Sequence, residues 1–278
     1  MMNKTVTTAC LLLSMSAYAG FGEGMLAYNK NDFATALKEW MPLAKQGNAS
    51  AQFNLGVMYD NGYGVPLDYK EAEKWYRLAA DQGNALAQLK LAAIYGNGYG
   101  VLQDPKEAEK WYRLAADQGN ATAQSILGVM YENGWGVPQN PKEAVKWSRL
   151  AADQGNADAQ FNLGLAYSKG RGVPQDDKEA VKWYRLAADQ GNAFAQFGLA
   201  VMYEKGWGVP PNRVLAFALY NVSATNDAVT GNKAAANREK LSSSMTAAEI
   251  EAGQSLSREM SKWGMLLKVL DEYNKSGG

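Results

Sequence analysis

The chain has 278 residues, and its 28 Lys and Arg balance its 28 Asp and Glu, so it carries no net positive charge to attract nucleic acid. It has no His, the commonest general base and transition-metal ligand, and a single Cys. We therefore expect no metal or cofactor site and no His- or Cys-dependent nucleophilic catalysis.

The first predicted element is an export signal over residues 1–19. Lys4 gives a positive start, an apolar stretch follows from about Val6 to Met15, and Ala17-Tyr18-Ala19 has the small-x-small pattern that precedes a cleavage site. The apolar stretch is too short to span a bilayer comfortably, and the alternative is a buried first helix of the fold. Cleavage after Ala19 would remove the only thiol, that of Cys10, and would place the protein in the periplasm or outside the cell.

Residues 20–47 are predicted to cap the N-terminal end of the fold. Within 23–46 we expect a single helix that covers the first repeat with four apolar residues, namely Ala36, Trp40, Leu43 and Ala44. Repeat proteins need such terminal caps because an end unit has no neighbour on its outer side.

An exact internal period occupies residues 48–227. The string Gln-Gly-Asn-Ala begins five times, always 36 residues apart, at Gln46, Gln82, Gln118, Gln154 and Gln190. Repeats of this length are single supersecondary units that bury their apolar faces only by stacking on neighbours. Two helical patterns alternate with two glycine-marked turns in each unit, which predicts an all-α solenoid of five helix pairs.

The first helix of the pair, helix A, is predicted from about Ala49 to Asn61. Ala51, Leu55 and Tyr59 recur every four residues and therefore share one face, and small residues such as Ala51 and Gly56 allow a second helix to approach closely. Gly62 is expected to end the helix in the left-handed conformation.

The second helix, helix B, is predicted from about Tyr69 to Gln82, after a Gly-x-Gly-Val turn. Asp68 is the expected N-cap, with Glu71 placed to complete a capping box. The expected apolar side consists of Ala72, Trp75, Tyr76, Leu78 and Ala79, and the tryptophans at this position in the first four repeats (Trp75, Trp111, Trp147 and Trp183) are expected in the core. The acidic Glu71-Glu73-Lys74 pattern suits a solvated face with local ion pairs.

With these positions assigned, the unit closely resembles the Sel-one-like repeat, a relative of the tetratricopeptide repeat. The resemblance runs from about Asp32 to Asp227 and rests on the series A-x-A-Q-x-x-L-G-x-M-Y-x-x-G-x-G-V-P followed by E-A-x-x-W-Y-R-L-A-A-D-Q-G-N. It implies a right-handed α/α superhelix that presents a concave surface to protein or peptide partners. A cysteine-rich branch of the family is associated with penicillin binding or hydrolysis, and this chain departs from that branch because its repeats contain no Cys.

Residues 228–278 are predicted to form C-terminal capping helices. Thr246 and Glu249 form a good capping box for a long helix. An apolar stripe follows at three- to four-residue steps, comprising Ile250, Leu256, Met260, Trp263, Leu267 and Leu270. The stripe suits a cap docked on the last repeat, or alternatively a dimerisation helix.

Candidate binding residues are those that vary between otherwise constant repeats. The middle residue of Gly-x-Gly is aromatic in four of five repeats, the series being Tyr63, Tyr99, Trp135, Arg171 and Trp207. Aromatic and Arg side chains are enriched at interface hot spots, although each ring could instead pack on its neighbour's turn. A second variable position on helix A reads Asn54, Lys90, Ile126, Asn162 and Gly198, and by analogy with tetratricopeptide proteins its Asn54, Lys90 and Asn162 would face a bound peptide.

Three functions are compatible with these features. The favoured one is an exported interaction module that binds a protein or peptide partner. The second is a binder of peptidoglycan or glycan in the cell envelope, with the turn aromatics stacking on sugars. The third is a hydrolase of β-lactam-type amides, which the absence of a Ser-x-x-Lys motif disfavours.

Overall fold

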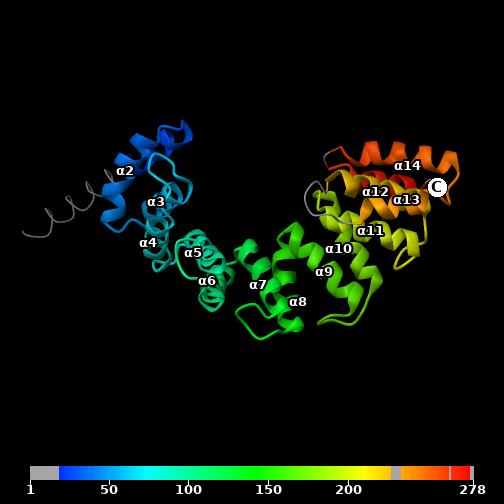
Figure 1. The fold of residues 1–278 in the computed structure, drawn as a ribbon, viewed down its shortest axis with the longest axis horizontal. Helices are drawn as coiled ribbons and strands as arrows, with labels where there is room; N and C mark the ends of the chain where they lie inside the picture. Colours follow the sequence, from blue (N-terminus) through cyan, green and yellow to red (C-terminus); the bar gives the residue numbers. More distant parts are fainter. Residues whose placement is uncertain (1–18, 227–232, 263, 276–278) are drawn as a thin grey trace, which may run out of the picture. The chain divides into compact units, whose positions relative to one another are not determined.

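The computed structural model describes residues 19–226, 233–262 and 264–275, and throughout these ranges the regular structure is helical, without a strand. The chain forms two compact units, one with residues up to Ala123 together with Trp135–Val137, the other with Gln124–Gly134 and Pro138 onwards. Within each unit, successive helices follow one another as packed pairs (Figure 1). The helices of the first unit are α2 (Phe33–Lys45), α3 (Ala49–Asn61), α4 (Tyr69–Ala80), α5 (Ala85–Asn97), α6 (Pro105–Asp117) and the start of α7 (Ala121–Asn133). Those of the second unit, after the rest of α7, are α8 (Pro141–Asp153), α9 (Ala157–Lys169), α10 (Asp177–Asp189), α11 (Ala193–Lys205), α12 (Arg213–Asn226), α13 (Ala234–Ser242), α14 (Ala247–Met260) and α15 (Leu266–Lys275).

The A helices begin and end where the sequence predicts, because both ends carry a specific signal. Asn48 accepts a hydrogen bond from the amide of Ala51 at 2.9 Å and so caps the start of α3. Gly62, at φ +71°, ends the helix in the left-handed region. The same pairing of an Asn N-cap with a left-handed glycine recurs at α5, α9 and α11.

The Gln of the repeated Gln-Gly-Asn-Ala string forms a hydrogen-bonded ladder with a second, buried Gln on helix A. In the first repeat, the Gln82 side chain donates to Gln52 Oε1 at 2.7 Å, and Gln52 Nε2 donates to the carbonyl of Ala44 at 3.0 Å. The next repeat has the same bonds, from Gln118 to Gln88 at 2.8 Å and from Gln88 onward to the preceding helix B. Because a buried amide is costly when unpaired, each rung fixes the register of one repeat on the next.

The second glycine of each Gly-x-Gly turn brings the turn against helix B of the preceding repeat. Gly172 has φ +72°, and a Cβ at this position would lie 2.2 Å from the carbonyl oxygen of Pro141, the first residue of α8. Gly136 and Gly208 lie equally close to the first residue of α6 and of α10. Glycine is therefore required here by close backbone contact as well as by its φ angle.

Helix B confirms the predicted core tryptophans and corrects two other assignments. Trp75 and Trp111 are buried, whereas Leu78 is 41% exposed, as are its equivalents in the next three repeats to a similar degree. Glu73 is not on a solvated face, since its carboxylate accepts from Arg77 Nε at 2.9 Å and from the Tyr95 hydroxyl at 2.9 Å. Leu78 and Glu73 lie at the two edges of the buried arc of the helix, where helical spacing alone does not decide which side chain is covered.

The predicted N-cap at Asp68 is confirmed, without the capping box. Asp68 Oδ1 accepts from the amides of Lys70 at 2.9 Å and Glu71 at 3.1 Å. The backbone amide of Asp68 donates to the carbonyl of Tyr59, which occupies the donor that a capping box would use. The Glu71 carboxylate pairs instead with Lys74 at 3.2 Å.

The N-terminal cap contains more helix than the sequence predicted. Residues 19–29 are helical and precede α2, where a single helix was expected. Trp40 of α2 is buried against this segment, and its Nε1 donates to the carbonyl of Phe21 at 3.3 Å. Gly24 makes the contact possible, since a Cβ there would lie 2.3 Å from the indole Nε1. The predicted export signal lies, up to residue 18, outside the described residues.

The C-terminal segment consists of α13, α14 and α15 rather than one long helix after Thr246. The capping box of Thr246 and Glu249 is confirmed at the start of α14. The chain turns at Gly264, whose φ of +66° is incompatible with a continuous helix, and Trp263 lies outside the described residues. The apolar stripe packs inside the chain: Met260 and Leu270 are buried in one cluster with α12.

Candidate partner-binding surface

In the first unit, two of the turn aromatics stack on the helix pair before them. Tyr63 lies parallel to Phe33, with ring centroids 4.8 Å apart and an interplanar angle of 5°. Tyr99 stacks on Tyr69 at 5.3 Å. One face of each ring is thus covered by the preceding repeat, yet Tyr63 remains 37% and Tyr99 49% exposed. Each ring contributes to packing and still presents a face to solvent.

Trp135 and Arg171 each match the residue at one position on the preceding A helix, the first in size and the second in charge. That position is Gly96 in the second repeat, and a Cβ there would lie 3.0 Å from Cη2 of Trp135, so the half-buried indole occupies the space beside the glycine. Glu132 holds the position in the third repeat, and Arg171 Nη1 pairs with its Oε1 at 2.9 Å. A small residue is therefore matched by Trp and an acid by Arg.

The helix A candidates of the first unit are also engaged by their neighbours. Asn54 Nδ2 lies 3.5 Å from the sulfur of Met25. The exposed ammonium of Lys90 lies 3.6 Å from Asp60 Oδ2, a pair of the kind that contributes little to stability.

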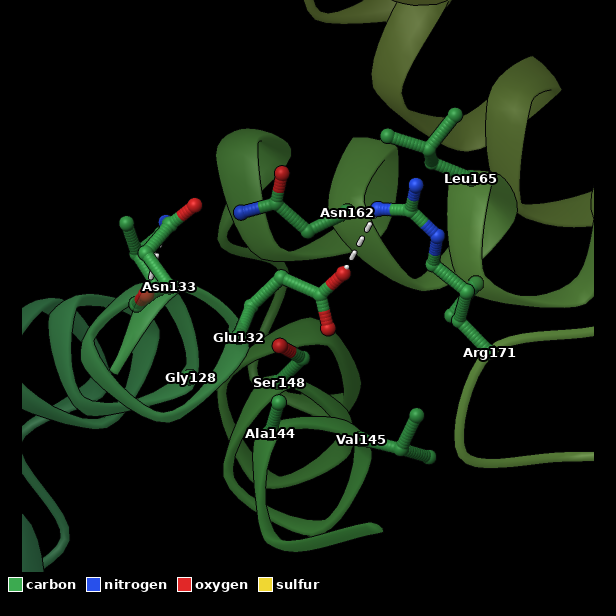
Figure 2. Close-up of a pocket in the computed structure, with 11 residues that line it drawn as sticks. Gly128, Glu132, Asn133, Ala144, Val145, Ser148, Asn162, Leu165 and Arg171 are labelled. Atoms are coloured by element: carbon green, nitrogen blue, oxygen red, sulfur yellow. Dashed lines mark hydrogen bonds and ion pairs between the residues drawn. The ribbon is translucent and has the colours of Figure 1, made fainter. Parts of the chain in front are cut away.

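In the second unit the structure brings the two candidate sets together. Asn162 of α9 and Arg171 of the following turn line one pocket of about 230 Å³, which Figure 2 shows with Glu132 between them. Gly198 of α11 and Trp207 of the next turn line a second pocket of about 290 Å³, whose walls also include Phe161 and Phe194. The variable helix A position and the variable turn position thus belong to one surface.

The first of these pockets occurs where the sequence departs from its own repeat. The other four repeats carry a buried tyrosine on helix B, namely Tyr76, Tyr112, Tyr184 and Tyr220, and the third repeat carries Ser148. Burial raises the pKa of Tyr112 and of Tyr184 to about 12, so these phenols stay neutral. Sequence reasoning missed Ser148, although its departure from tyrosine is visible in the repeat alignment.

Among the described residues there is no group of three or more Asp, Glu, His or Cys side chains arranged to hold a metal ion. The same part of the chain contains no helix with the length and hydropathy needed to cross a bilayer.

Comparison with known proteins agrees with this architecture. The Sel1 repeat profile matches residues 49–84, 85–120, 121–156, 157–192 and 193–227. The crystal structure of a Sel1 repeat protein from Oxalobacter formigenes is 35% identical, superposes with a TM-score of 0.74, and is covered over 97% of its length by 86% of this chain. A protective antigen of uropathogenic Escherichia coli with the same fold is 29% identical at a TM-score of 0.62, over 93% of this chain and 63% of that one.

A curated relative is the ERAD-associated E3 ubiquitin-protein ligase component HRD3A of Arabidopsis thaliana. It is 37% identical over 68 residues, which are 24% of this chain and only 9% of the relative. The similarity is thus confined to a small part of the relative. Five consecutive matches and the solved structures establish that this chain belongs to the Sel1 repeat family, whose members are repeat scaffolds that generally act in protein–protein interaction.

Proposed function

We propose that the chain is an exported scaffold that binds a protein or peptide partner through the surface shared by the A helices and the Gly-x-Gly turns. The observation that carries the proposal is the convergence of Asn162 with Arg171, and of Gly198 with Trp207, on common pockets. Within the second unit, residues that vary against a constant framework gather on one surface, and the aromatic and Arg character of Trp207 and Arg171 is that of interface hot spots.

The half-exposed turn aromatics have ring surface that a bound partner would cover. Trp207 is 47% exposed, close to the 49% of Tyr99. Trp135 differs because its indole fills the space beside Gly96, so its replacement would disturb packing as well as binding. Tyr99 and Trp207 are therefore the residues that best separate the two effects.

We expect Tyr99→Ala and Trp207→Ala each to weaken partner binding by about 1–2 kcal/mol, because each removes an aromatic contact that a partner would cover. The measurement is crosslinking capture from envelope extract, followed by titration of the captured partner. Leu114→Ala is the matched control, since Leu114 is 46% exposed but lies on helix B. Equal loss in the control, or none in the two variants, would exclude this surface.

The same proteins applied to purified peptidoglycan sacculi test the alternative function. Binding to sacculi that depends on Tyr99 and Trp207, without any protein captured, would assign the surface to glycan instead.

Export is the remaining part of the proposal and rests on the Ala17-Tyr18-Ala19 pattern. Mass spectrometry of the protein from its native host should find Gly20 as the N-terminal residue. A mature chain that retains Cys10 would contradict it.

A further inference from the structure

We propose that the pocket between α7, α8 and α9 is a receptor for one phenol ring, the side chain of a tyrosine in a bound peptide. At the position of Ser148, which lines this pocket, the other repeats carry a tyrosine of the chain itself. The identity of the occupant as part of a peptide rests on the proposed function, while the affinity of the pocket for a phenol does not.

The third repeat lacks the tyrosine that helix B carries in the other four. In the first repeat the ring of Tyr76 lies directly over Gly56, where a Cβ would be 2.5 Å from ring Cδ1. In the fourth repeat Tyr184 lies over Gly164 in the same way. The third repeat keeps the glycine, Gly128, but a Cβ there would meet the hydroxyl oxygen of Ser148 at 2.4 Å and backbone atoms of α8 at 3.2 Å and 3.3 Å, with no ring. The third repeat thus keeps the glycine of the first and fourth repeats without the ring.

A second shortened side chain faces the same space from the next A helix. The position is large and buried in the other four repeats, where it is Met58, Ile94, Met130 and Met202. In α9 it is Ala166, which lines the pocket together with Ser148. Two large side chains are therefore replaced by small ones around a single space, and such replacements leave a cavity where the backbone holds its position.

The polar partner for a phenol hydroxyl is already in place. In the first repeat the Tyr76 hydroxyl donates to Asp60 Oδ2 at 3.1 Å, and in the fifth the Tyr220 hydroxyl donates to Glu204 Oε2 at 2.7 Å. The equivalent acid of the third repeat is Glu132, which lines the pocket. Arg171 pairs with Glu132 at 2.9 Å, which keeps a charged acceptor at the position where a tyrosine hydroxyl would end.

The volume of the pocket fits a single aromatic side chain. Its volume is about 230 Å³, and a dry protein cavity of about 150 Å³ is known to hold benzene. Pockets for whole drug-sized ligands generally exceed about 300 Å³. Val129, Val145 and Leu165 supply apolar walls for a ring, with the acid at one side.

The test uses p-cresol, the tyrosine side chain as a free molecule, titrated into the purified full chain and followed by NMR. We expect saturable binding with a dissociation constant on the order of 1 mM or tighter. Toluene, which lacks the hydroxyl, should bind at least about threefold more weakly, and Glu132→Ala should reduce that preference. No saturable shift with p-cresol, or equal affinity for toluene, would overturn the proposal.

Filling the pocket from within should abolish the site. Ser148→Tyr restores the residue of the other repeats, so we expect a higher melting temperature and no p-cresol binding. Leu150→Tyr places the same ring two residues away on the exposed side of α8 and should leave binding unchanged. If Ser148→Tyr does not fold, Ala166→Met fills the space from α9. A folded filled variant that still binds p-cresol would refute the assignment.

Capture of a partner by the wild type and by Ser148→Tyr then distinguishes the tyrosine-binding proposal from the scaffold function proposed above. If the wild-type chain captures a protein and the Ser148→Tyr variant does not, the tyrosine is supplied by that partner. Equal capture by both would overturn the tyrosine assignment while leaving the scaffold function intact, whereas capture by neither would remove the scaffold function alone.

Discussion

Replacement of Trp111 by Ala should lower the free energy of unfolding by about 3–5 kcal/mol, as large-to-small changes in a packed core do. Trp111 is buried in α6, its Nε1 donates to Glu107 at 3.0 Å, and the guanidinium of Arg77 lies 5.8 Å from its ring centroid. The variant therefore loses a ring, a hydrogen bond and a cation–π contact together. Chemical denaturation monitored by circular dichroism measures the change.

The control is Leu114→Ala, one helical turn further along α6, where the side chain is largely exposed. We expect this variant to stay within about 0.5–1 kcal/mol of the wild type. Hydrogen exchange should show the Trp111 defect in the neighbouring helices, because the repeats of a solenoid couple to their nearest neighbours. A cost below about 1 kcal/mol at Trp111 would mean that the ring is not part of the core.

The Gly172→Ala variant should be destabilised by roughly 3 kcal/mol or more. The backbone at this position has a left-handed φ, and a residue with a side chain adopts that conformation at a cost of about 1–2 kcal/mol. The added Cβ would also lie 2.2 Å from the backbone oxygen of Pro141, which cannot move without shifting the start of α8. Thermal and denaturant unfolding of the variant both report the effect.

Gly155→Ala separates the two contributions. Gly155 has φ +87°, but no atom lies within 4 Å of its Cβ position. We expect only the conformational cost there, about 1–2 kcal/mol. Equal losses in the two variants would show that the turn can move away from α8, and that the close approach at Gly172 contributes nothing.

Helix positions were predictable wherever the sequence marks both ends of an element. The bounds Ala49–Asn61 of α3 follow from Asn48 and Gly62, each with its own local geometry. Inside the C-terminal stripe Gly264 is such a mark, but apolar residues continue in helical spacing past it, so the break between α14 and α15 was not foreseen. Periodicity also misplaced Leu78, because this residue lies at the edge of the buried face, where helical spacing does not determine exposure.

The candidate surface was predictable in part for a similar reason. Asn162 and Arg171 stand out as variable positions in the sequence, but their position in one pocket depends on how the turn of one repeat docks on the repeat before it. Ser148 and Ala166 are readable as departures from the repeat, yet they are 18 positions apart and belong to different repeats. Only the packing of α9 against α8 shows that both shorten side chains around the same space.

The glutamine ladder limits how such a chain can change its length during evolution. Four rungs join two Gln residues at the same 30-residue spacing, as Gln118 joins Gln88, so a duplication of one whole 36-residue unit recreates such a rung unchanged. An insertion of any other length inside a helix would leave a buried amide without its partner, at a cost of about 1–3 kcal/mol. Genes for these proteins can therefore lengthen or shorten by complete units without altering the interior, and the residues free to diverge afterwards are those outside it, the candidate binding positions among them.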